Sequence, residues 1–427
     1  SKIGHVRLIG DEHITRLLHQ FESTDPPQTA PIGYRTGTLS LATPSEITAM
    51  VTVDGGQAVV SNDVVPAKRL GFIKIGTLVI TDQQLQILRD NPVMDPRERT
   101  RVFEHAATHE SAVVPLSGIR MPGETVRETI RKTIDRVIGY TRLYPVLLAL
   151  VNRSWNPSYS MDPQRNQDAP HFNCVSCDAN IWVPCDKYIF SCLSCGATHT
   201  LSDYLAIGQD TGEEWAREEI VMSLRNVMET LTLFQWVLRC YQEYPHALPR
   251  MLFLKDGPLL LRANLSRLVE PIRDLIGTIR RKGHTLHLIG IEKNGQLVDH
   301  INEIQTHLPD PGDFFLPSIQ YLMEQIAGVR YEPTTYRDRV QYGTKVVVRL
   351  GPHHVLPLHI GTERPITNPV PADLPGLKEI ATTLSGVLSY SHDNALIPIK
   401  LANDSSSLSE RPSGDILKRF VEQILGH

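Results

Sequence analysis

Two Cys-x-x-Cys pairs constrain the fold of this chain more than any other feature. They read CVSC, with Cys174 and Cys177, and CLSC, with Cys192 and Cys195. Each pair forms a tight turn that points two thiolates at one place, and four thiolates make a tetrahedral cage for Zn²⁺. The intervening residues 178–191 predict a short hairpin that completes a zinc ribbon. A site with four protein ligands is closed, so we expect it to be structural.

Two other interpretations of these cysteines stay open. They could form two disulfides, which are rare inside cells, or one pair could be a redox motif, which needs only two cysteines. Trp182 and Phe190 could pack over the hairpin between the pairs. The two further cysteines, Cys185 and Cys240, are expected to be small buried residues.

Length and composition indicate an ordinary globular chain. With 427 residues, of which 41% are hydrophobic and 21% charged, it can bury a sizeable core and divide into two or three domains. The longest apolar run, YPVLLALV, is far shorter than the roughly 20 residues that span a bilayer. The first residues, SKIGHVRLIGDEH, contain no apolar signal segment. We therefore expect a cytoplasmic protein without a membrane association.

The net charge of −4 and the pI near 6.5 give no overall sign of nucleic-acid binding, so any such surface must be local. Solvated helix faces are the alternative explanation for basic clusters of this kind. The candidate clusters are Arg127, Arg131, Lys132 and Arg136 on one predicted helix, and Arg273, Arg280, Arg281 and Lys282 on another.

Two strand-like segments each carry an aspartate followed by glycine. Residues 49–60 read AMVTVDGGQAVV and contain Asp54, and residues 251–261 read MLFLKDGPLLL and contain Asp256. Asp-Gly is also a favoured turn dipeptide, so plain turns in an unrelated zinc-ribbon protein are one interpretation. If the strands instead lie side by side, both carboxylates reach one place and could bind a metal ion.

The rest of the chain alternates between predicted helices and strands. Periodic apolar residues predict one amphipathic helix over 123–151, and a polar linker follows it into the ribbon. A long helix is expected to begin near Thr211, a suitable N-cap, and to run to about residue 245. Further strands are predicted over 71–80 and 111–119, and further helices over 270–283, 377–388 and 415–425.

Four segments in this order resemble the NurA nuclease family: VTVDGG, SLRNVMET, LFLKDGPL and LIGIEKNG. The resemblance implies an RNase H-like α/β fold, with a mixed sheet flanked by helices, into which the zinc ribbon is inserted. The nuclease domain would then consist of residues 1–150, with the first Asp strand, and 206–427, with the Glu helix and the second Asp strand. The inserted ribbon would span 151–205.

The resemblance also implies the site and its chemistry. Asp54, Asp256 and the helical Glu229 would bind Mn²⁺ or Mg²⁺, because hard cations prefer oxygen ligands. Two such ions can activate water and stabilise the leaving oxygen of a phosphodiester. Lys293 would neutralise the scissile phosphate. Glu229 and Lys293 could instead be ordinary surface residues.

The family further implies DNA as the substrate and a HerA-type hexameric ATPase as the partner of a nuclease homodimer. DNA end repair and antiviral defence are the implied settings. The sequence has no P-loop and no G-x-S-x-G motif, so ATP hydrolysis and serine-hydrolase chemistry have no support. Strand polarity, strand preference and the choice between endonuclease and exonuclease are not determined by these motifs.

The C-terminal part departs from the family pattern. NurA proteins have a Tyr-Pro segment followed by a site histidine, but the corresponding stretch LIPIKLANDSSS contains Pro398 and no histidine. Asp404 could take that place, with Tyr390 and His392 slightly upstream. The missing histidine leaves open an alternative function, a non-catalytic DNA-binding or scaffold subunit with a degenerate nuclease fold.

Two histidine clusters are weaker metal candidates. His105 and His109 would lie one turn apart on an exposed helix, and His353, His354 and His359 fall in a strand-like segment. Without a further ligand nearby, we expect neither cluster to bind a metal.

Overall fold

The structure is a computed structural model of the 427-residue chain. It describes residues 16–17, 19–20, 34–61, 67–91, 94–103, 106–208, 216–332, 337–389, 394–408 and 413–425. Among these residues, no helix combines the length and the apolar character needed to cross a membrane.

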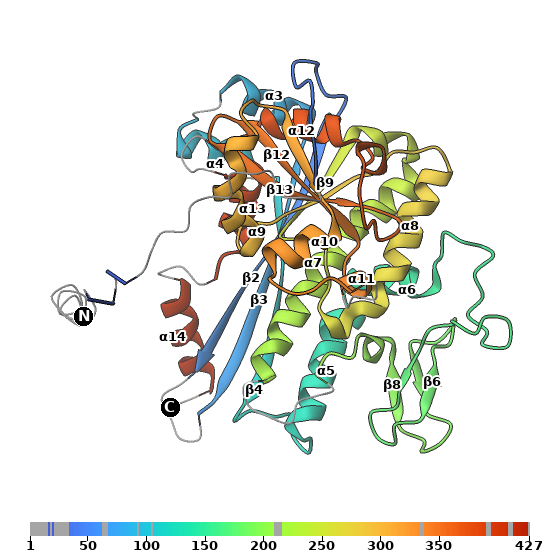
Figure 1. Ribbon diagram of the computed structural model, residues 1–427. Coiled ribbons are helices and arrows are strands. Elements are labelled where there is room, and N and C mark those ends of the chain that lie inside the picture. Colours follow the sequence, from blue (N-terminus) through green and yellow to red (C-terminus); the bar gives the residue numbers. More distant parts are fainter. Residues whose placement is uncertain are drawn as a thin grey trace.

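A nine-stranded mixed sheet forms the centre of the molecule (Figure 1). Its strand order is β1-β11-β12-β13-β10-β9-β2-β3-β4, so strands from both sides of the four-cysteine segment share one sheet. The strands are β1 (Tyr34–Thr38), β2 (Ala49–Ser61), β3 (Arg69–Ile80), β4 (Ala107–Ser117), β9 (Met251–Asp256), β10 (His287–Ile291), β11 (Asp313–Pro317), β12 (Gly343–Gly351) and β13 (His354–Gly361).

Five of these strands have the RNase H-like arrangement that the sequence predicts. β2, β3 and β4 pair antiparallel, and β9 and β10 then join β2 in parallel, which gives the order β4-β3-β2-β9-β10. The remaining strands extend the sheet beyond β10 with antiparallel pairs. The predicted fold class, a mixed sheet with flanking helices and an inserted four-cysteine unit, is confirmed.

Strand β2 does not end at its aspartate, contrary to the expectation from the Asp-Gly dipeptide. It continues through Gly55 and Gly56 and stays paired with β3 as far as Ser61. The alternating apolar residues on both sides of Asp54 support this long strand, and pairing with β3 outweighs the turn preference of Asp-Gly. Only Asp256 stands at a strand end, where Gly257 has a φ of +105°.

Helices cover both faces of the sheet. On one face Val51 and Val53 of β2 pack in a core with α5 (Val126–Gly139), α6 (Leu143–Asn152), α7 (Ala216–Glu243) and α8 (Val269–Arg281). On the other face Met50 packs in a core with α3 (Asp82–Asp90), α4 (Pro96–Phe103), α12 (Leu377–Ser385) and α13 (Ile397–Ser406). The remaining helices are α9 (Gln296–Ile304), α10 (Ile319–Tyr321), α11 (Arg337–Val340) and α14 (Ser413–Leu425).

The single helix predicted over 123–151 is in fact two helices, α5 and α6. Pro145 lies in the first turn of α6 and has no N–H to donate to the carbonyl of Thr141, so a continuous helix would lose a hydrogen bond there. The Thr141 hydroxyl donates to the carbonyl of Val137 at 2.8 Å and accepts from the N–H of Leu143 at 3.2 Å. These two bonds close one helix and start the next.

The four-cysteine unit consists of two hairpins beside α5, seen in Figure 1 at the labels β6 and β8. β5 (His171–Asn173) pairs with β6 (Asn180–Trp182), and β7 (Ile189–Ser191) pairs with β8 (Thr198–Thr200). Each Cys-x-x-Cys therefore occupies the turn of its own hairpin, and the single hairpin predicted between the pairs is wrong. Backbone bonds from Cys174 to Ala179 and from Cys192 to Ala197, both 2.8 Å, close these turns.

Candidate active site and metal centre

Asp54 and Asp256 come together on one face of the sheet. Val53 pairs with Lys255 in the parallel β2–β9 ladder, so the next residue of each strand faces the same side. The two carboxyl groups are close enough to share a hydrogen bond. Burial, together with the neighbouring Asp54 charge, raises the pKa of Asp256 to about 6. Two carboxylates held this close favour a proton or a cation between them.

Helix α13 contributes a second contact to Asp54. The Ser406 hydroxyl donates to Asp54 Oδ2 at 2.8 Å, and the backbone N–H of Gly55 donates to Oδ1 at 2.8 Å. The helix can come this close because two strand positions lack side chains. A Cβ at Gly56 would lie 2.0 Å from the Ser406 carbonyl oxygen, and one at Gly76 would lie 2.3 Å from Ser405 Oγ.

This contact gives a first prediction. Gly56→Ala is expected to push the end of α13 away from β2 and to destabilise the protein by about 1–3 kcal/mol, the usual cost of overpacking. Thermal or urea unfolding measures the loss. Ser406→Ala is the matched comparison, because it removes the bond to the carboxylate without adding volume. Wild-type stability in Gly56→Ala would contradict the close packing.

Lys293 also reaches the carboxylate pair. It follows β10 by two residues, and its Nζ lies 2.7 Å from Asp256 Oδ2, while 38% of the side chain is exposed. This attraction opposes the effect of burial on the pKa of Asp256. The site therefore already contains a positively charged side chain, and the partly exposed Lys293 can turn from Asp256 toward an incoming anion.

Glu229 lies on the other face of the sheet. Successive side chains of β2 alternate, and a Cβ at Gly55 would lie 2.3 Å from Glu229 Oε1, whereas Asp54 faces α13. Glu229 Oε2 is 3.1 Å from Lys255 Nζ, and Oε1 is 3.3 Å from Arg225 Nε. The carboxylates of Glu229 and the two aspartates thus do not converge as the four cysteines do.

The partner of Glu229 is a buried lysine that the sequence did not single out. The Lys255 side chain is 3% exposed and that of Glu229 is 4% exposed. Burial alone lowers a lysine pKa, but attraction to Glu229 outweighs it, and the pKa of Lys255 is raised. The Lys255 ammonium is therefore held charged inside the protein, beside the Glu229 carboxylate.

A second charged cluster follows β10, with Glu292 and Lys345 partly buried and His359 fully buried. Glu292 Oε2 accepts from Lys345 Nζ at 2.8 Å and lies 3.1 Å from His359 Nε2. Burial opposes ionisation, but the bonds to His359 and Lys345 prevail and lower the pKa of Glu292 to about 2. This cluster fixes the residue next to Lys293. The register of three strands brings the cluster together, because His359 of β13 pairs with Gly290 of β10 and with Lys345 of β12. The sequence alone does not show this register, so the cluster was not predicted.

The C-terminal candidates have different outcomes. Asp404 is exposed on α13, and Ser406 is the residue of this helix that bonds to Asp54. Tyr390 and His392 lie outside the described residues. Pro398 stands in the first turn of α13, where proline fits. Ser406 went unnoticed because a serine in a polar run carries no distinctive signal.

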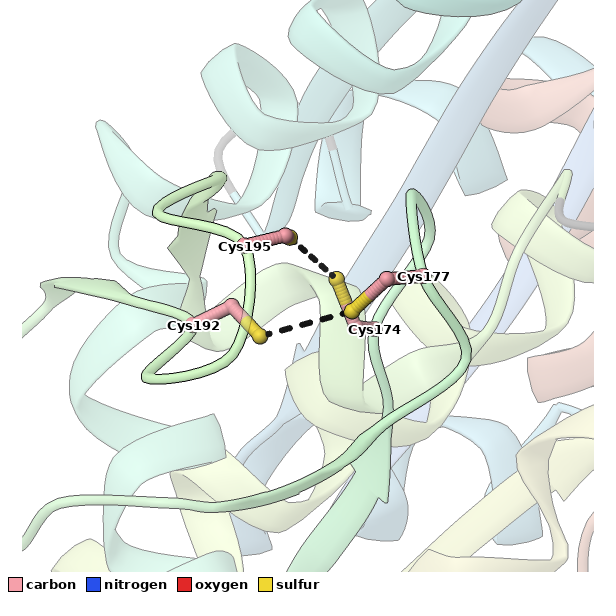
Figure 2. A group of neighbouring side chains, drawn as sticks. All are labelled: Cys174, Cys177, Cys192 and Cys195. Atoms are coloured by element: carbon pink, nitrogen blue, oxygen red, sulfur yellow. Dashed lines mark hydrogen bonds between the residues drawn. The ribbon is translucent and has the colours of Figure 1, made fainter.

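The four cysteines form a compact cluster (Figure 2). Their sulfur atoms all lie within 4.8 Å of one another, with 3.6 Å between Cys174 and Cys195 and 3.7 Å between Cys177 and Cys192. Sulfurs about 2.3 Å from a central ion at the corners of a tetrahedron are about 3.8 Å apart. The backbone N–H groups of Cys195 and Ser194 lower the pKa of Cys192 to about 6. The donor set therefore fits a tetrahedral metal ion.

The two other cysteines differ from each other. Cys240 is buried, as expected, with its Sγ 3.3 Å from Met251 Sδ. Cys185 is exposed, contrary to expectation, because it lies in the connection between the two hairpins. Trp182 packs against His171, with ring centroids 4.8 Å apart, and Phe190 packs against Phe172 at 6.1 Å.

Most of the basic side chains proposed as local DNA surfaces have partners within the chain. Arg131 binds Asp203, and Arg273 donates to the carbonyl of Gln341. The other pairs are Lys132 with Glu124, Arg280 with Glu363, Arg281 with Asp274, and Lys282 with the Tyr241 ring. This pattern favours the interpretation as ordinary structural helix faces.

The histidine candidates do not form a metal cluster among the described residues. His109 lies in strand β4 and not on a helix, and His105 lies outside the described residues. β13 contains His354 and His359 as a strand, as predicted, whereas His353 lies in the turn before it. His354 Nε2 bonds to the carbonyl of Ser389 at 2.9 Å, which accounts for its burial.

The fold and the site define a mixed α/β protein with an RNase H-like sheet, a largely buried carboxylate pair and a four-cysteine cluster. No protein-family model matches the chain, and no curated protein matches it. Among solved structures, it is similar to the NurA nuclease from Sulfolobus solfataricus, with 12% sequence identity and a TM-score of 0.36. The match covers 99% of this chain and 97% of that one.

Proposed function

We propose that this chain is a metal-dependent nuclease that hydrolyses phosphodiester bonds in DNA. The observation that supports this most is the pairing of Asp54 with Asp256 at the end of β9. Buried carboxylates that repel each other form a site for a hard divalent cation, and Mn²⁺ or Mg²⁺ fits an all-oxygen donor set. When bound, such an ion would activate water and stabilise the leaving oxygen.

The residues around the pair have defined tasks in this proposal. Asp54 and Asp256 hold the ion, and Ser406 and the Gly55 N–H fix the orientation of Asp54. Lys293 is partly exposed beside Asp256 and binds the scissile phosphate. Glu229 remains a predicted third ligand, but it lies on the opposite face of the sheet, paired with Lys255 and Arg225, so it could serve only after a rearrangement that brings it to the aspartates.

We further propose that the four cysteines bind Zn²⁺ as a structural ion, because all four donors are thiols at tetrahedral spacing. The ribbon is then an inserted unit of residues 151–205 between the two parts of the nuclease domain. Since the sequence has no P-loop, a HerA-type hexameric ATPase would supply DNA movement to a nuclease homodimer. A cytoplasmic role in DNA end repair or antiviral defence would follow.

The alternative is a non-catalytic DNA-binding or scaffold subunit. One observation favours it: Glu229 is neutralised by a buried lysine, and Lys293 and Ser406 already occupy oxygens of the carboxylate pair. In that case the charges would be balanced within the protein and need no divalent ion.

Cleavage of labelled linear and circular DNA with Mn²⁺ or Mg²⁺ distinguishes the two functions. Asp54→Asn is expected to lower the rate at least about 10³-fold, equivalent to about 4 kcal/mol. Asp404→Asn is the matched control, because this exposed aspartate lies on the helix that touches the site. If folded, zinc-loaded wild type cuts no DNA with either ion, with and without the ATPase, the nuclease proposal fails.

A further inference from the structure

A series of contacts between polar side chains leads from the four-cysteine cluster to helix α5. His199 Nε2 lies 3.3 Å from Cys174 Sγ, and His199 Nδ1 lies 3.2 Å from Asp203 Oδ2. The imidazole is 0% exposed and stands between Phe172 and Phe190. Both ring nitrogens are therefore engaged, one with a cysteine and one with a carboxylate.

Asp203 continues this series of contacts to helix α5. It lies in the short helix η1 (Leu201–Leu205), and Arg131 of α5 donates to it through two nitrogens, at 2.7 Å and 2.6 Å. Arg131 also donates to the carbonyl of Thr198 at 2.6 Å, in the strand that carries His199. Asp203 is 6% exposed, so its oxygen atoms need hydrogen-bond partners within the protein, which these donors supply.

The contacts among Cys174, His199, Asp203 and Arg131 are more specific than the packing of this region needs. A buried imidazole beside a thiol, a carboxylate and a two-pronged guanidinium would be costly if any link were absent. Histidines and carboxylates that bond to metal ligands in this way orient the ligand atoms and strengthen metal binding. Here the outermost member of the series, Arg131, belongs to a helix that packs on strand β4.

We propose that His199, Asp203 and Arg131 form a positioning relay between the four-cysteine centre and helix α5. The relay orients Cys174 Sγ toward the metal ion and fixes the ribbon on α5. Metal retention and the stability of α5 therefore depend on each other. The inference rests on metal binding by the four thiols and is independent of DNA cleavage.

The experiment perturbs each end of the relay and measures the other end. Zinc content is determined first in the full-length wild type, and zinc release to a chromogenic chelator is then timed. Arg131→Met touches no cysteine, yet it is expected to speed zinc release at least about tenfold. Lys132→Met is the matched control, because Lys132 neighbours Arg131 on α5 and, within the described part of the chain, its ion pair is with Glu124. It is expected to leave the release rate unchanged.

The reverse measurement uses His199→Phe and hydrogen exchange of the α5 amides. Exchange over Val126–Gly139 is expected to become at least about tenfold faster, although no α5 residue is changed. His171→Phe is the control, since His171 is exposed in the same unit and contacts Trp182. In the Co²⁺-substituted protein, His199→Phe should also shift the sulfur-to-cobalt absorption band, whereas His171→Phe should not.

Asp203→Asn tests the middle link if His199→Phe fails to fold. It keeps the shape of the side chain and is expected to affect both readouts in the same direction as the end variants. Unchanged zinc release in Arg131→Met together with unchanged α5 exchange in either ribbon variant would overturn the relay. So would wild-type protein that binds no metal at the thiols, whatever its activity on DNA.

Discussion

Asp256→Asn is expected to make the metal-free protein more stable at neutral pH. The pKa of Asp256 is raised from its ordinary value of 3.8 to about 6, so between these values the folded state holds more protons than the unfolded state. The unfolding free energy of the wild type therefore falls as the pH rises from about 4 to 6 and stays lower above it. Removing this charge is expected to restore about 3 kcal/mol at pH 7.

Thermal unfolding in a chelating buffer at pH 4 and pH 7.5 measures this effect. The variant should exceed wild type at pH 7.5, with a much smaller difference at pH 4, where the wild-type carboxyl is protonated. Lys293 loses its partner in the variant, but its partly exposed side chain can turn to water at little cost. Asp404→Asn should not show this pH dependence.

Added Mn²⁺ should reverse the order of stability. Wild type is expected to gain stability as the ion binds the folded state, whereas Asp256→Asn should gain little. The effect should strengthen as the pH rises through about 6, because the ion competes with the proton on Asp256. A wild type that is insensitive to divalent ions would argue for the scaffold alternative.

Glu229→Gln is expected to lower the free energy of unfolding by about 3–5 kcal/mol. It leaves the Lys255 ammonium buried with its main counter-charge removed, and breaking one side of a buried pair is costly. Arg225 cannot compensate, since it carries the same positive charge. Urea unfolding measures the difference in unfolding free energy.

The double variant Glu229→Met with Lys255→Met separates charge from packing. Both methionines are apolar and similar in size to the residues they replace, so much of the lost stability should return. Arg239→Met is a control for an exposed pair, because Arg239 binds Glu243 on the same helix. A Glu229→Gln variant as stable as wild type would show that Lys255 is not held by this glutamate.

The sequence was sufficient for strands β2 and β9 and for the pairing of their two aspartates. Alternating apolar residues identify β2 and β9, and the family motifs place their aspartates at one site. It was not sufficient for Glu229, although its helix was predicted. Whether a helical residue reaches the same face of the sheet as Asp54 depends on the stacking of helix and strand, which periodicity does not encode.

Other parts of the site depend on contacts between distant segments. Ser406 reaches Asp54 because Gly56 and Gly76 leave room for α13, and no local pattern links these positions. The Arg131–Asp203 bond similarly joins a helix to a hairpin unit, so Arg131 resembled a surface cation in the sequence. Local sequence patterns therefore predict helices and strands. The partners of buried charges can be identified only from the three-dimensional structure.

The order of the strands along the sequence determines when the carboxylate site can form during translation. β2, β3 and β4 emerge from the ribosome early, whereas β9, the parallel neighbour of β2, follows the ribbon and the long helix α7. Ser406 is separated from Asp54 by 352 positions. Such long-range pairing forms slowly, so a nascent chain carries Asp54 without Asp256 until β9 is made, and without Ser406 until α13 is made near the end of translation. The bond from Ser406 to Asp54 can therefore form only when nearly the whole protein has been made.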